Sequence, residues 1–315
     1  IAEVSGVDLP YEFVVVNNST PNAWALPGGK IAVNRGLLME LRSEAELAAV
    51  LAHEIAHSAA RHGARRIERG MLLQGGLLAA SIASQKSKYG RLVVGGAQIG
   101  AQLIQQKYSR EAEFEADQYG MQFMSNAGYD PNAAVDLQET FVLLSKSREK
   151  NWLSGLFSTH PPSQDRVKRN QKQLDSMQIN AKIGTITGVQ KYRDAISYIG
   201  QKKPAYEKYA EARQAFVNGE LVKAEKAITA AIKIEDSDST FHTLRGDIAY
   251  EQEKFVASLV GYDRAIQLSE HFASFLGRGL AHVQLNETLL AKNDLLQSIE
   301  LLPTSEALYE LGKIS

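Results

Sequence analysis

The 315-residue chain is 44% hydrophobic, which is ordinary for a protein with packed cores, and its length predicts about two domains. Lys and Arg number 35 against 36 Asp and Glu, and the resulting net charge of −1 does not indicate a nucleic-acid partner. The sequence contains no cysteine, which excludes disulfides, thiolate metal sites and a cysteine nucleophile. Any metal ion would therefore be held by histidine and carboxylate side chains.

Residues 1–175 mix strand and helix patterns. The short β-branched runs 13–16 and 30–33 predict strands. Between them, Pro27 and two glycines form a turn sequence that should fold Ala23–Leu26 against Lys30–Asn34 as a hairpin. The first part of the chain is therefore expected to contain a small β-sheet.

A helix should begin at Ser43, which has the spacing of a capping box with Glu46, and should end at Gly63. Within it, His53 and His57 are four residues apart, or about 40° around the helix axis, so both imidazoles point the same way. This is the arrangement that two ligands of one tetrahedral ion require.

Glu54 lies beside these two histidines, where its carboxylate can accept a proton from a water molecule that the ion activates. The HExxH motif also occurs by chance, in amphipathic helices with two surface histidines. A third ligand is therefore needed to support a zinc site with Glu54 as general base.

The candidates for the third ligand are His62, His160 and the carboxylates of residues 110–117. His62 would lie about 140° around the helix from His57, so we expect a surface histidine there. On the later helix, Glu113 and Asp117 fall between apolar stripes, whereas the neighbouring glutamates fall on a polar side. Carboxylates in an apolar sector need a cation or strong donors.

We therefore predict Glu113 as the third ligand and Asp117 as the partner that orients a ligand imidazole through its other ring nitrogen. The alternative is an internal salt bridge to an arginine, which leaves the two histidines unexplained.

Two further apolar segments, Met71–Ala83 and Leu92–Ile104, are shorter than the roughly 20 residues of a membrane span. We predict two buried or interfacial helices that wall or gate the cleft, with peripheral membrane contact as the lesser alternative.

Residues 176–204 are expected to form an irregular connection, and residues 205–315 are helical and repetitive. Ala231 aligns with Ala265 in a step of 34 residues, and a further step of 33 aligns Gly279 with Gly246. This period resembles about three tetratricopeptide repeats, whose stacked helix pairs leave a concave groove for a peptide or a partner protein.

The combined motifs resemble the gluzincin-type zinc metallopeptidase family that includes HtpX, the CAAX prenyl proteases and BepA. The motifs are the HExxH helix, the later segment from Ser109 to Asp117, the hairpin with its Pro-Gly-Gly turn, and Thr159-His160-Pro161-Pro162 with Arg166. The repeats are similar to those of the BepA-like branch. The fold implied is α+β and mostly helical: a peptidase domain with a small sheet, followed by an all-α repeat domain.

In this family context, His160 is expected over the metal, as a fourth ligand that closes the site or as an oxyanion donor. Arg166 is a candidate for the transition-state charge or for anchoring a carboxylate. The resemblance also implies one zinc ion per chain and a bacterial periplasmic enzyme, soluble or peripheral to the membrane. The chain begins at Ile1 without a visible signal peptide, which we expect to have been removed.

The predicted function is that of an endopeptidase in envelope protein quality control. Substrate would extend along the hairpin edge, adding a strand at Asn22, Ala23, Trp24 and Ala25. The alternative is a latent protease that acts mainly as a chaperone or scaffold. A non-peptidase metal hydrolase is a lesser alternative, and it predicts no extended edge strand beside the metal.

Overall fold

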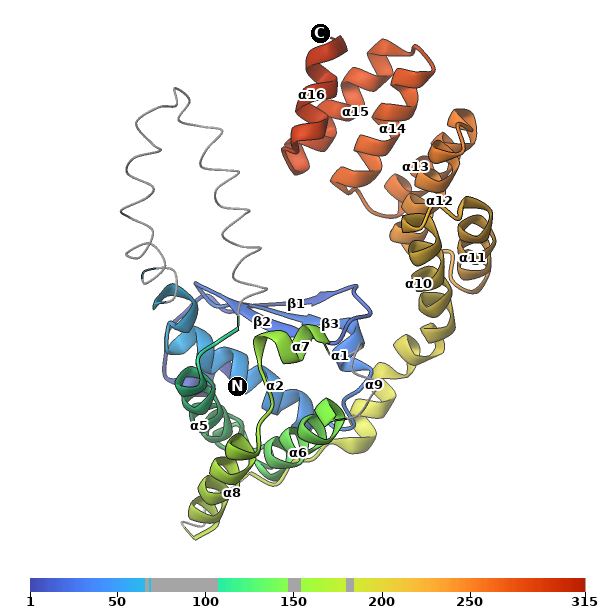
Figure 1. The fold of residues 1–315 in the computed structure, drawn as a ribbon. Coiled ribbons are helices and arrows are strands. Elements are labelled where there is room, and N and C mark those ends of the chain that lie inside the picture. Colours follow the sequence, from blue (N-terminus) through green and yellow to red (C-terminus); the bar gives the residue numbers. More distant parts are fainter. Residues whose placement is uncertain (66–67, 69–106, 147–153, 180–183, 315) are drawn as a thin grey trace. The chain divides into compact units, whose positions relative to one another are not determined.

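A computed structural model describes residues 1–65, 68, 107–146, 154–179 and 184–314. They form two compact units, Ile1–Ser197 and Tyr198–Ser315. The first unit combines a small sheet with helices (Figure 1). Its elements are η1 (Ala2–Ser5), β1 (Glu12–Val16), β2 (Ala23–Leu26), β3 (Lys30–Asn34), α1 (Arg35–Leu38), α2 (Glu44–Ala59), α5 (Arg110–Asn126), α6 (Asn132–Lys146), α7 (Ser154–Thr159), α8 (Gln164–Ile179) and α9 (Val189–Gln201).

The sheet has the strand order β1-β3-β2. The predicted hairpin is confirmed, because β2 pairs antiparallel with β3, with Ala23 opposite Val33 and Leu26 opposite Lys30. Its turn needs a left-handed backbone, and Gly28 supplies it with a φ of 91°. Strand β1 pairs in parallel with the other side of β3. Among the described strands, β2 therefore lies at an edge of the sheet.

Helix α2 begins as predicted at Ser43, whose hydroxyl accepts the N–H of Glu46 at 3.0 Å. The second half of the capping box differs from the prediction. The Glu46 carboxylate accepts the N–H of Arg42, at 2.6 Å, rather than that of Ser43. The start of the helix is thus fixed by two hydrogen bonds of Glu46, one to Ser43 and one to Arg42.

The expected end of this helix at Gly63 is wrong, because α2 ends at Ala59. Arg61 has a φ of 56°, in the left-handed region that a continuing α-helix excludes. The residues that follow therefore leave the helix axis, which changes the position of His62.

Helix α2 packs against β2 and β3 and against α5 and α6, so it lies in the middle of the first unit (Figure 1). Gly120 of α5 permits this packing, since a Cβ there would lie 3.1 Å from the backbone nitrogen of His53. The surrounding core is apolar, with Ala52, Ile55 and Met124 fully buried. The HExxH motif is thus held on a helix fixed from several directions.

The expectation of an irregular connection at 176–204 is wrong over most of the described segment: α8 continues to Ile179, Val189–Gln201 forms helix α9, and the next helix begins at Lys203. Burial of one aromatic side chain explains α9: the Tyr192 ring is 5% exposed, and its hydroxyl donates to the Leu38 carbonyl at 2.8 Å. The predicted turn at Gly188 is present, with a φ of 63°.

Beyond α9, the described elements are all helices, and they belong to the second unit. They are α10 (Lys203–Val217), α11 (Leu221–Ile234), α12 (Ser239–Glu251), α13 (Phe255–Leu268), α14 (Phe272–Gln284), α15 (Thr288–Leu301) and α16 (Ser305–Ile314). The starts of α11, α13 and α15, at Leu221, Phe255 and Thr288, are separated by the predicted steps of 34 and 33 residues. The repeated helix pairs are therefore confirmed.

The predicted helices at 71–83 and 92–104 lie outside the described residues. Among the described helices, none combines the length and the apolar character that crossing a membrane requires.

Candidate metal centre

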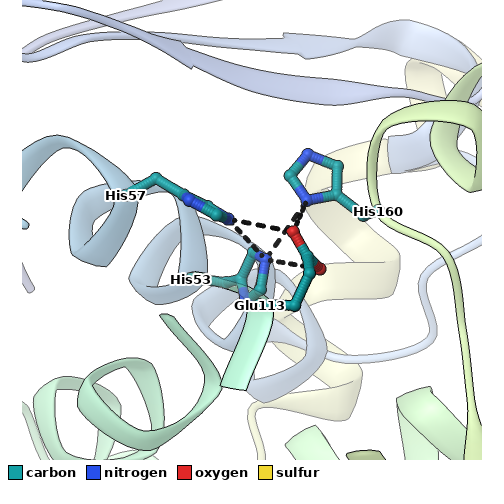
Figure 2. Close-up of side chains that lie close together, drawn as sticks. All are labelled: His53, His57, Glu113 and His160. Atoms are coloured by element: carbon teal, nitrogen blue, oxygen red, sulfur yellow. Dashed lines mark hydrogen bonds and ion pairs between the residues drawn. The ribbon is translucent and has the colours of Figure 1, made fainter. Parts of the chain in front are cut away.

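The two histidines of the HExxH motif lie on the same side of α2. Their Nε2 atoms are 3.0 Å apart, and the His57 side chain is fully buried. Figure 2 shows both imidazoles directed toward the Glu113 carboxylate and the His160 ring. The spacing of four residues thus places two nitrogen ligands at one point.

Glu113 and His160 reach this point from α5 and from the residue after α7. Glu113 Oε1 lies 3.4 Å from His57 Nε2 and 3.1 Å from His160 Nδ1. His160 Nδ1 lies 3.3 Å from His53 Nε2. One ligand atom from each of the four side chains lies within 4.8 Å of every other.

These four atoms fit a tetrahedral metal ion. Ligands at about 2.0–2.1 Å from a tetrahedral centre are separated by roughly 3.3 Å from one another. Four of the six separations, 3.0, 3.3, 3.1 and 3.4 Å, lie close to that value, and all six are within 4.8 Å. Three imidazole nitrogens and one carboxylate oxygen are also donors that divalent transition metals accept.

Asp117 and Arg166 form the layer behind this group. The Asp117 carboxylate lies 3.0 Å from His53 Nδ1, the ring nitrogen that faces away from the other ligands. Arg166 donates to both oxygens of Asp117, at 2.7 and 2.6 Å, and contacts Glu113 at 2.7 Å. Of the two roles considered for Arg166, its buried contacts are those of an anchor for carboxylates.

The contacts shift the protonation of the group. Burial lowers the pKa of His53, but its bonds to Asp117 and Glu113 outweigh this and raise the pKa to about 10. Burial opposes ionisation of Asp117 too, yet the Arg166 charge holds the pKa of that carboxyl at about 2. The same guanidinium keeps the pKa of Glu113 well below its usual range despite burial. Burial, together with the charge of His53, lowers the pKa of His57.

Glu54 borders the same group. Its residue is 2% exposed, and Oε1 lies 3.4 Å from His160 Nε2. Its Oε2 atom is buried and has no hydrogen-bond partner among the described residues. Burying a carboxylate oxygen without a hydrogen-bond partner is unfavourable in free energy. The unpaired Oε2 therefore indicates a position that binds a ligand or a proton in the active enzyme.

The predicted surface position of His62 is wrong. The residue is 6% exposed, and its Nδ1 lies 2.8 Å from His57 Nδ1. The prediction extended α2 past its true end, whereas the left-handed Arg61 turns the chain back toward the ligands. Tyr108 was also missed: its ring stacks on that of His57 with centroids 3.9 Å apart, and no sequence pattern marks it.

The residues predicted to bind substrate lie at and before β2. Asn22, Ala23 and Ala25 are buried and Trp24 is half-buried, so Trp24 is the most accessible of these four residues. A cavity of about 260 Å³ is lined by Ala25 from this strand and by the ligand His57. The edge strand and one of the four candidate ligands, His57, therefore border this cavity.

The first part of the chain is similar in sequence to known proteins. Residues 1–173, more than half of the chain, match the sequence profile described as peptidase family M48. The mitochondrial metalloendopeptidase OMA1 of Schizosaccharomyces pombe is 39% identical over 182 residues, which are 57% of this chain and 51% of that protein. The beta-barrel assembly-enhancing protease of Yersinia pestis is 31% identical over 182 residues, 56% of this chain and 37% of that protein.

The chain also has a weaker likeness to a solved structure, the Arabidopsis OM64 TPR domain. It covers 36% of this chain and 96% of that one, with 19% identity and a TM-score of 0.36.

A helix-borne HExxH motif with a downstream glutamate defines the metallopeptidase class. The chain belongs to peptidase family M48. The family resemblance noted in the sequence is thus confirmed, and so is the expected enzyme class at the level of the family. The chain spans about half, or less, of the length of these relatives.

Proposed function

We propose that this chain is a zinc-dependent endopeptidase, with residues 1–175 as its catalytic domain and residues 205–315 as a repeat domain that binds protein. The convergence of His53, His57, Glu113 and His160 within 4.8 Å carries the proposal. Membership of family M48 supports the peptidase activity. A non-peptidase hydrolase is disfavoured, because β2, an edge strand among the described strands, lines a cavity together with the ligand His57.

One zinc ion would be held by His53, His57 and Glu113, with the fourth position open to water during catalysis and filled by His160 at rest. Such an ion polarises a carbonyl group and makes water easier to deprotonate. Asp117 supports this role: it accepts from His53 Nδ1, leaves the lone pair of Nε2 free for the ion and is itself held by Arg166.

The acid–base step falls to Glu54. Its free Oε2 would take the proton from the attacking water and later pass it to the leaving amine. The substrate backbone would pair with the outer edge of β2, as the sequence predicts for Asn22–Ala25, which would place its scissile bond next to the ligands. These residues orient the peptide and move one proton.

The experiment is the substitution Glu54→Gln, which keeps the size of the side chain and removes the base. We expect one zinc ion per chain by elemental analysis, and kcat/KM on a casein-type substrate reduced by about 10²–10⁴-fold. Glu111→Gln is the matched control, because Glu111 is an exposed glutamate at the start of α5. Cleavage by Glu54→Gln at the wild-type rate would refute the assignment.

A second function, a latent protease that acts mainly as a scaffold, is favoured by the position of His160. Its Nδ1 completes the ligand group, and its Nε2 lies 3.4 Å from Glu54, so the ring stands where substrate and water must enter. Casein cleavage by His160→Ala distinguishes the two. Faster cleavage indicates a closed resting enzyme, and zinc-loaded protein that is inactive in both forms indicates a scaffold.

For partners and location we keep the expectations of the sequence: protein substrates, a client or partner in the repeat groove, and envelope protein quality control in the bacterial periplasm. The name of one relative, a beta-barrel assembly-enhancing protease, supports the bacterial envelope, whereas the mitochondrial metalloendopeptidase supports the peptidase activity alone. Peripheral membrane contact remains the lesser proposal.

A further inference from the structure

His57 makes a contact that the proposed reaction does not use. Its Nδ1, the ring nitrogen that faces away from the other ligands, lies 2.8 Å from Nδ1 of His62. The second nitrogen of His62 lies 3.1 Å from Glu115 Oε2. The side chains of both histidines are buried, whereas that of Glu115 is 40% exposed. A chain of contacts therefore runs from the ligand group to the protein surface.

The chemistry of imidazole fixes which group donates and which accepts in this series of contacts. His57 Nε2 faces His53 Nε2 at 3.0 Å and Glu113 at 3.4 Å, so it is the atom that would ligate and must carry no proton. In a neutral ring the proton is then on Nδ1, which donates to His62 Nδ1. His62 in turn carries its proton on Nε2 and donates to Glu115. A single tautomer at each ring satisfies every contact.

The two ligand histidines of α2 differ in this respect. The outer nitrogen of His53 contacts a carboxylate directly, at 3.0 Å from Asp117, and Arg166 neutralises that carboxylate. The outer nitrogen of His57 reaches a carboxylate only through a neutral imidazole. Tyr108 stacks on the face of the His57 ring, not on its Nδ1 edge.

We propose that His62 is a positioning residue for the metal: it fixes the tautomer and the ring orientation of His57, with Glu115 holding His62 in place. The inference rests on the metal site of the proposed function. Partners that orient ligand histidines typically contribute about 10–100-fold to metal affinity. His62 should therefore affect metal affinity and ligand geometry without touching the substrate.

The test uses the full chain and compares His62→Leu with His62→Asn. Leucine removes the acceptor for the His57 proton, whereas the asparagine side-chain oxygen can replace Nδ1 as acceptor. Zinc affinity is measured by chelator competition, and the visible spectrum of the cobalt-substituted protein reports the ligand geometry. We expect a loss of about 10–100-fold in zinc affinity for leucine with a changed cobalt spectrum, and a loss of at most about threefold for asparagine.

Glu115→Gln is compared with Glu111→Gln, because both glutamates are on α5 and only Glu115 contacts His62 among the described residues. We expect a weaker loss for Glu115→Gln and none for Glu111→Gln. Thermal melts of the metal-free variants separate misfolding from a local effect, since metal-free His62→Asn and His62→Leu should melt within a few degrees of each other.

The outcomes separate this inference from the proposed function. Wild-type protein that binds no zinc would defeat the proposed function itself. Zinc bound by the wild type and equally well by His62→Leu, with an unchanged cobalt spectrum, would overturn only the role of His62. Equal losses in the leucine and asparagine variants would also overturn it, because the acceptor would then be irrelevant.

Discussion

Each of the two compact units is stabilised by a different kind of core. At the centre of the first unit, ionisable side chains are buried together, and Arg166 is 3% exposed between the carboxylates of Asp117 and Glu113. The core of the second unit is built mainly from alanines together with a few isoleucine, leucine and aromatic side chains, with Tyr262 2% exposed. Charges that depend on one another make a site sensitive to single changes, whereas close packing makes a unit sensitive to added volume.

The largest difference between the units should follow from Arg166→Met. This change leaves two buried carboxylates without their cation, and the loss of one partner from a buried pair costs about 3–5 kcal/mol. Trp24 and Trp152 both lie in the first unit, so tryptophan fluorescence during denaturation follows that unit alone.

Arg169→Met is the control for this change. Arg169 is exposed and lies over the Phe114 ring at 3.9 Å, so its loss should cost less than about 1 kcal/mol. If Arg166→Met unfolded at the same denaturant concentration as the wild type, the buried charges would not stabilise one another.

A smaller effect, confined to the second unit, is expected for Gly261→Ala. A Cβ at this position would lie 2.6 Å from the backbone nitrogen of Gly246, so α12 and α13 must separate. We expect a loss of about 3 kcal/mol in the helical transition seen by circular dichroism, with unchanged tryptophan fluorescence. Gly312→Ala, which meets nothing within 4 Å, should be neutral or slightly stabilising. Equal stability of the two variants would contradict close packing as the cause.

The smallest effect is a pH dependence opposite in sign to that of the first unit. Burial raises the pKa of Asp247 to about 6, against the opposing hydrogen bond from Tyr262 and with help from Glu251. The folded pKa then exceeds the unfolded value, so the second unit gains stability as the pH falls from about 6 toward 4. For Asp117, whose pKa is lowered to about 2, stability is present above its ordinary pKa and is lost as the pH falls through the folded value.

Asp247→Asn keeps the bond with the Tyr262 hydroxyl and removes the charge. The raised pKa corresponds to about 3 kcal/mol at pH 7, and solvent screening at this half-buried side chain should leave a gain of about 1 kcal/mol. The gain should become small near pH 4, where the folded-state aspartate is protonated. Thermal melts at the two pH values measure the difference. A gain that is the same at both would point to packing instead of ionisation.

Much of the fold could be predicted from local signals. The turn after Leu26, the cap at Ser43 and the repeat period of 34 and 33 residues each depend on residues close in sequence, and the structure has all three. Helix α9 was missed because its formation depends on a distant contact, from Tyr192 to the Leu38 carbonyl.

In the candidate site, too, the features set by nearby residues could be predicted and those set by distant contacts could not. Helix phase selected His53, His57 and Glu113, because one helix or one apolar sector determines where each side chain points. The position of His62 depends on the single left-handed residue Arg61, which the sequence pattern does not reveal. The partner of Arg166 could not be chosen from the sequence, since Asp117 is 49 residues away along the chain.

The most direct test of the central claim is anomalous diffraction at the zinc edge from crystals of the zinc-loaded chain. The account predicts one peak per chain, bonded to His53 Nε2, His57 Nε2 and a Glu113 oxygen at about 2.0–2.1 Å. His160 Nδ1 should occupy the fourth position in the absence of substrate. A peak elsewhere, or a zinc ion at the two α2 histidines without Glu113, would contradict the account.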